Sequence, residues 1–200
     1  MGLKFSIPYQ IPFYETDITH HVKLPHLLAF SLQVSGMQSE SLGNTDKDVF
    51  DNYGLVWIVT DYAIEIDRLP RYNEKVTITT EAISYNKIFC YRNFYITDEA
   101  GQQIMLFKTT FALMDYETRK VAEVPDEVVA PYGADKIIVV DGEEYQHYTT
   151  DAYADAMYAL VTKYGPTTMM IGATNEGRDM GPRLSCRLRT GLTADCTAVD

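Results

Sequence analysis

Apolar residues follow two different periods in the first part of the chain. Between Leu24 and Leu42 they recur at roughly helical spacing, with Pro25 in the first turn and Gly43 at the end, which predicts one long helix. The runs around it are rich in Val, Ile, Thr, Tyr and Phe, a composition typical of strands. We expect strands at Lys4–Ile11, Leu55–Asp67, Lys75–Tyr85, Ile88–Thr97 and Gln103–Met114.

The order of these elements predicts how they pack. A long helix followed by strands that are joined through turns, such as Asp98–Gly101, favours an antiparallel sheet wrapped around a central helix. Such a helix must be apolar on most of its faces, because the sheet curls around it. The first domain is therefore expected to be of the α+β class and to span residues 1–130.

The pattern changes near residue 130, after which there is no Phe and no Trp. Unbroken apolar runs at Lys136–Asp141 and Thr168–Ala173 are typical of buried parallel strands, and helical patterns follow at Thr149–Gly165 and Gly177–Thr190. This alternation predicts a small, partial α/β lobe with parallel strands over residues 131–200. Residues 193–197 are the candidate start of a third unit.

Composition and charge narrow the classes of function. The net charge is −11, which argues against nucleic-acid binding, because phosphate contacts need a basic surface. The three cysteines, Cys90, Cys186 and Cys196, show no metal spacing and suit a reducing cytoplasm. No signal peptide and no run long enough to span a membrane is expected. We therefore expect a cytoplasmic protein.

Several spaced segments of the first domain resemble the N-terminal half of bacterial acyl-acyl-carrier-protein (acyl-ACP) thioesterases. They are FYETDITHHVKLPHLLAFSLQVSG, LVWIVTDYAIEIDRLPRYNEKVTITTEAISYNKIFCYRNFYITDEAGQ and TTFALMDYETRKVAEVPDEVV. The resemblance implies a hot-dog fold, acyl carrier protein as partner, and release of free fatty acid in fatty acid biosynthesis. In that family a second hot-dog domain carries a catalytic D-x-N-x-H motif, and we expect no second such domain within these 200 residues.

The nearest local match to that motif is Asp17, Thr19 and His21, just before the helix. Thioester hydrolysis needs an activated water and donors for the developing oxyanion. Asp17 or Glu15 would orient the water, His21 would act as base, and the helix N-terminus would polarise the carbonyl. The alternative is that Asp17 and Thr19 are ordinary capping residues and that the histidines are solvated.

Two further sets of residues are candidates for binding. An apolar slot for the acyl group is expected to include Leu28, Leu32, Trp57, Tyr62 and Phe89, unless these side chains only form core. The residues expected to contact a negatively charged carrier protein are Arg68, Arg71, Lys87 and Arg92, unless these charges only solubilise the surface.

Residues 130–200 resemble an interior piece of the N-terminal domain of the electron-transfer flavoprotein alpha subunit, above all at GATNEGRDMGPRLSCRLRTGLTADCT. In that family FAD is bound mainly by a later domain, so we expect no cofactor here, and FAD only if this resemblance is functional. The turn at Gly172–Asp179 either cradles a phosphate or provides tight packing at Gly177 and Gly181. No metal site is expected.

The chain therefore resembles a fusion of two family fragments, with the seam at Val128–Lys136. Three hypotheses follow. The chain is a hydrolase of acyl-ACP thioesters, with possible homodimers; or it is a flavoprotein-type fragment for electron transfer; or it is an acyl-binding remnant without catalysis. Acyl chain length, oligomeric state, the origin of the fusion and whether the chain is active stay open at this point.

Overall fold

The computed structural model describes residues 2–194 and divides the chain into two compact units. The N-terminal unit comprises residues 2–138 and the C-terminal unit residues 139–194. The boundary lies after Ile138, beyond the composition change near residue 130. Cys196 and most of the possible third unit at 193–197 lie outside the described residues.

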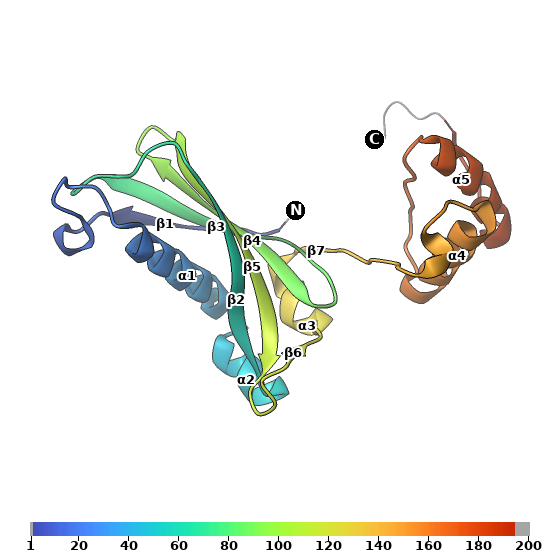
Figure 1. The fold of residues 1–200 in the computed structure, drawn as a ribbon, viewed down its shortest axis with the longest axis horizontal. Coiled ribbons are helices and arrows are strands. Elements are labelled where there is room, and N and C mark those ends of the chain that lie inside the picture. The colour runs from blue at the N-terminus through green and yellow to red at the C-terminus, as the bar shows by residue number, and fades with distance from the viewer. Residues whose placement is uncertain (1, 195–200) are drawn as a thin grey trace. The chain divides into compact units, whose positions relative to one another are not determined.

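An antiparallel sheet forms the framework of the N-terminal unit (Figure 1). Its long strands are arranged in the order β1-β3-β4-β5-β2. Their bounds are β1 (Lys4–Gln10), β2 (Leu55–Ile66), β3 (Lys75–Tyr85), β4 (Phe89–Asp98) and β5 (Gln103–Asp115). The short β6 (Val121–Ala122) pairs with β5. The five strands expected for this unit are thus all present, with end positions that differ by at most one residue.

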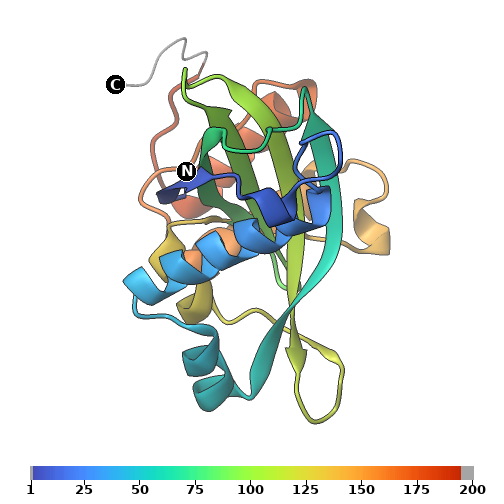
Figure 2. The ribbon, with the colours of Figure 1, turned by 90° about the vertical axis from the view of Figure 1, so that its left-hand side faces the viewer.

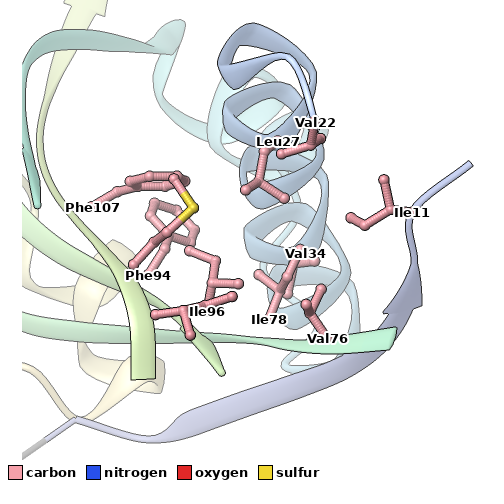
Figure 3. Packing of buried hydrophobic residues seen from close by; sticks show 11 residues of the cluster. Ile11, Val22, Leu27, Val34, Val76, Ile78, Phe94, Ile96 and Phe107 are labelled. Carbon is pink, nitrogen blue, oxygen red and sulfur yellow. The ribbon is translucent and has the colours of Figure 1, made fainter. Parts of the chain in front are cut away.

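Helix α1 (Leu24–Ser41) lies across one face of this sheet (Figure 2). Leu27 and Val34 of α1 are fully buried and belong to the same core cluster as Ile78 and Phe107 of the strands (Figure 3). The expected central helix is therefore present. Its end is an αR residue, Leu42, with Gly43 in the left-handed region directly after it.

A second helix, α2 (Asp46–Tyr53), follows α1 and was not expected from the sequence. Thr45 and Asp48 form a reciprocal capping box at its start, and Gly54 ends it in the left-handed region at φ 67°. A helix of this length contains too few apolar residues to show a helical period. The capping box and the glycine were therefore its main signals in the sequence.

The seam segment folds onto the N-terminal unit. It contains α3 (Asp126–Val129), the 3₁₀ turn η2 (Ala130–Tyr132) and β7 (Asp135–Lys136). Val128, Val129 and Tyr132 are buried, and β7 pairs in parallel with the end of β3. Like η1 (Phe13–Glu15) before α1, η2 is a single tight turn.

The C-terminal unit contains η3 (Glu143–Tyr145), α4 (Thr150–Tyr164) and α5 (Asn175–Leu188). Both helices were expected. The parallel strands expected at Lys136–Asp141 and Thr168–Ala173 do not form: apart from β7, the described residues of these runs have no strand pairing. Val139 is 73% exposed and Met170 78% exposed. A parallel strand is stable only when neighbouring strands and helices cover it, and the two helices alone do not provide that.

Candidate functional site

A cavity of about 230 Å³ lies between α1 and the strands of the N-terminal unit. Its helix wall contains Leu32, Ser35, Gly36 and Ser39, and the facing strands contribute mostly apolar and aromatic side chains. Gly36 has no heavy atom within 4 Å of the position that a Cβ would take. A glycine at this point of α1 therefore leaves open space that any larger side chain would occupy. We refer to this space as the α1 cavity.

The α1 cavity includes part of the apolar set expected from the sequence. Leu32 and Trp57 line it together with Tyr91, and so do Cys90, Phe111 and Tyr132, which were not expected. Leu28 instead packs against the main core cluster, and Tyr62 and Phe89 are half-buried outside the lining. For Phe89 the alternation of β4 explains this, because Phe89 and its neighbour Cys90 point to opposite faces of the sheet.

The thiol of Cys90 is a poor nucleophile in this setting. Burial raises its pKa to about 12, and the nearby charge of Arg92 lowers it only in part. A cysteine with such a pKa is a thiol at neutral pH, so it acts as a small apolar side chain of the cavity wall. Among the described residues that line the cavity there is no histidine.

One wall of the α1 cavity is polar. The Arg92 side chain is 8% exposed, and its Nη1 donates to Gln38 Oε1 at 2.6 Å and to Thr80 Oγ1 at 2.8 Å. The Tyr132 ring centroid lies 4.9 Å from the guanidinium carbon. Burial lowers the pKa of Arg92 to about 10. The expected role of Arg92 as a surface contact for a carrier protein is therefore wrong, because alternation in β4 points it into the core.

The other three basic candidates are on the surface. Arg68 pairs with Glu74 at 2.8 Å and Asp98 at 3.3 Å, and Lys87 pairs with Glu123 at 2.6 Å. Arg71 is exposed, and its backbone forms an isolated antiparallel β-bridge with that of His21. Internal ion pairs thus partly neutralise Arg68 and Lys87. Their contact with a carrier protein stays a prediction.

The Asp17, Thr19 and His21 side chains meet in the loop before α1. Asp17 Oδ1 accepts hydrogen bonds from Thr19 N at 2.8 Å, Thr19 Oγ1 at 2.7 Å and His21 N at 3.1 Å. Thr19 Oγ1 lies 2.9 Å from His21 Nδ1. Since Thr19 donates its proton to Asp17, it accepts from Nδ1, which leaves Nε2 as the basic atom of a neutral His21. This geometry fits both an oriented base and a simple loop cap.

None of these three residues lines the α1 cavity. Asp17 instead contributes to a shallow surface depression with Phe13, Ile18 and His20. The buried carboxylate of this region is Glu15, which is 7% exposed and whose Oε2 has no hydrogen-bond partner among the described residues. Burial together with a hydrogen bond to Glu15 raises the pKa of Tyr9.

We expect the Asp17 carboxyl to titrate below the usual range for aspartate. The Thr19 hydroxyl and then the His21 amide donate to the carboxylate and lower its pKa. Because the pKa of Asp17 is depressed in the folded state, its ionised carboxylate stabilises the loop fully above about pH 4. This stabilisation is lost as the pH falls through the folded-state pKa. An NMR titration of the Thr19 amide measures this. Thr19→Ala should move the Asp17 pKa upward, and an Asp17 that titrates above its normal value in the parent would contradict the assignment.

In the C-terminal unit, the glycine-bearing turn has a packing explanation. A Cβ at Gly177 would lie 2.0 Å from the carbonyl oxygen of Gly172. Thr174 caps α5 by accepting from the Gly177 amide. Phosphate binding there stays a prediction, as does any FAD. Within residues 2–194, no group of three or more metal-ligating side chains and no helix suited to span a membrane is present.

Comparisons with known proteins match the two parts of the chain to two families. Residues 2–132 match the acyl-ACP thioesterase N-terminal domain, and residues 114–200 match the electron transfer flavoprotein domain. The crystal structure of a protein assigned as an oleoyl thioesterase from Lactobacillus plantarum is 35% identical, with a TM-score of 0.67, and the match covers 70% of this chain and 55% of that one. This likeness confirms the hot-dog fold and the α+β class.

Known proteins are similar to each of the two parts of the chain. The acryloyl-CoA reductase electron transfer subunit beta of Anaerotignum propionicum is 44% identical over 105 residues, which is 52% of this chain and 26% of the relative. The chloroplastic acyl-[acyl-carrier-protein] hydrolase FATB3 of Cuphea viscosissima is 25% identical over 159 residues, which is 73% of this chain and 38% of the relative. The chain thus spans well under half the length of these relatives. Because the thioesterase model covers residues 2–132, which is more than half of its length, the chain belongs to the acyl-ACP thioesterase family, and its residues 114–200 are similar to the electron transfer flavoprotein domain.

Proposed function

We propose that the N-terminal unit binds the acyl group of acyl-carrier-protein thioesters in the α1 cavity, for hydrolysis to free fatty acid. The observation that carries the proposal is a largely apolar cavity beneath the central helix of a thioesterase-family unit. Apolar walls favour an alkyl chain, at about 0.8 kcal/mol for each methylene removed from water.

The hydrolytic step has a candidate apparatus in the loop before α1. His21 Nε2 would take a proton from water while Thr19 and Asp17 hold the imidazole, a relay supported by the 2.9 Å and 2.7 Å contacts. The group expected to polarise the carbonyl is the N-terminus of α1 at Leu24, where Pro25 has no N–H and the His26 amide donates to the Lys23 carbonyl oxygen.

A second candidate function, acyl binding without turnover, is favoured by a specific observation. The three loop residues do not line the cavity that would hold the acyl group. Release of free fatty acid from acyl carrier protein by the purified chain, lost in His21→Ala, supports hydrolysis. Tight binding with no release supports the second candidate, and absence of both contradicts the proposal.

Filling the cavity should block binding. In Gly36→Leu, the side chain occupies the open space beside α1, and we expect acyl affinity to fall about tenfold or more, because burial of about two methylenes is lost. Binding is measured by displacement of a fluorescent fatty acid from the full chain.

The matched control is Gly36→Ala. A single methyl at this open position leaves most of the space free and should raise helix stability by about 0.5–1 kcal/mol. Both variants are expected to fold, so the comparison isolates volume. Equal affinity in Gly36→Leu and Gly36→Ala would show that the acyl group lies elsewhere.

A further inference from the structure

The polar wall of the α1 cavity holds a buried cation that has no acidic partner. Arg92 uses only Nη1 for hydrogen bonds, to the neutral groups of Gln38 and Thr80. Within the described part of the chain, no carboxylate forms an ion pair with it. A guanidinium carries five N–H donors in a fixed planar fork. The donors on Nη2 and Nε are therefore left without a protein acceptor among these residues.

The acid on the adjacent strand and the acid on the cavity lining do not pair with Arg92. Glu81 is buried on the adjacent strand, but it pairs with Asn93 in the register, and Ala82 pairs with Arg92. Glu81 therefore points to the opposite face of the sheet, where it contacts Lys4 Nζ at 3.7 Å and accepts from Tyr95 Oη at 3.2 Å. The acid on the cavity lining itself is Asp46, which is exposed in the first turn of α2.

Burial of an unpaired guanidinium is unfavourable, as the lowered pKa of Arg92 indicates. The Tyr132 ring offsets part of this cost through a cation–π contact at 4.9 Å. A ligand that brings a negative charge into the cavity would offset the rest. A planar carboxylate fits best, because it accepts two parallel N–H bonds from the guanidinium fork.

The remaining walls determine what this carboxylate is attached to. Leu32, Trp57 and Phe111 form apolar surface next to the arginine. We propose that the α1 cavity binds a free fatty acid anion, with its carboxylate on Arg92 and its alkyl chain along these residues. The inference rests on the proposed acyl-binding role of the cavity and goes beyond it, since it makes the released acid a ligand that competes with the acyl substrate.

The test compares ligands that share an alkyl chain and differ in the head group. Decanoate, decanol and methyl decanoate are titrated into the full chain by calorimetry, below the concentration at which they aggregate. A charge-assisted hydrogen-bond pair predicts that decanoate binds about tenfold or more tightly than the two neutral ligands. Equal affinity of all three would overturn the inference while leaving acyl binding intact, and binding of none would overturn both.

Two substitutions test whether Arg92 causes the tighter binding of decanoate. Arg92→Met should abolish the advantage of decanoate over decanol, whereas Lys108→Met, which removes an exposed charge on β5, should retain it. A retained preference in Arg92→Met would overturn the assignment. Should Arg92→Met fail to fold, Gly36→Leu serves instead: it should weaken both decanoate and decanol, and unchanged decanoate binding would place the carboxylate outside the cavity.

Discussion

Replacing Tyr132 with alanine is expected to lower the free energy of unfolding of the N-terminal unit by about 3–5 kcal/mol, the range for removal of a large buried aromatic ring. Tyr132 is 5% exposed, although it lies in the seam where the two families meet. Its Oη lies 2.7 Å from Ser39 Oγ, and its carbonyl oxygen accepts from the Leu3 amide at 2.8 Å. One residue thus connects the seam, α1 and the chain preceding β1.

The measurement is urea unfolding followed by fluorescence of Trp57, the single tryptophan, which lies in this unit. Tyr132→Phe is the matched control, because it keeps the ring and removes only the hydrogen bond to Ser39, for an expected loss of about 0.5–1.5 kcal/mol. A loss in Tyr132→Ala no greater than in Tyr132→Phe would show that the seam does not stabilise this unit.

The second large effect concerns the C-terminal unit. Gly177→Ala is expected to destabilise α5 by about 1–3 kcal/mol, as overpacking against rigid atoms does. The added Cβ would lie 2.0 Å from the Gly172 carbonyl oxygen, which is backbone and cannot rotate away. The segment before α5 would have to move, and with it the Thr174 cap.

Gly181→Ala is the control on the same helix. Its Cβ would meet only Ile171 Cδ1 at 3.7 Å, an ordinary contact, so the higher helix propensity of alanine should raise stability by up to about 1 kcal/mol. Amide hydrogen exchange over residues 175–188 separates the two variants. Faster exchange in Gly181→Ala than in Gly177→Ala would contradict this account.

The helix and strands of the N-terminal unit were predictable because their apolar periods are long and are separated by turn residues. α1 and the strands β2 to β5 each bury one face or more, so the pattern repeats many times within each element. The same reasoning failed at Lys136–Asp141 and Thr168–Ala173. An apolar run there indicates a strand only if partners exist to pair with it, and pairing is a property of the assembled fold.

For the site, the sequence identified residue types but not their surroundings. It named Leu32 and Trp57 as candidates for the acyl slot, and both line the α1 cavity. It placed Arg92 with the surface charges, because the residues adjacent to Arg92 in the sequence do not indicate which face of β4 its side chain occupies. Gln38, Thr80 and Tyr132, which surround Arg92, come from three separate segments.

The family, the fold of the first part and the existence of a seam could be predicted because they depend on local periodicity and spaced motifs. The packing of the seam and the location of the Arg92 charge, in contrast, depend on tertiary contacts. Burial and pairing are set by residues distant along the chain, as the contacts of Tyr132 with Leu3 and Ser39 illustrate. The unpaired charge of Arg92 in the α1 cavity therefore could not be predicted from the sequence, because it depends on how β3, β4 and α1 pack together.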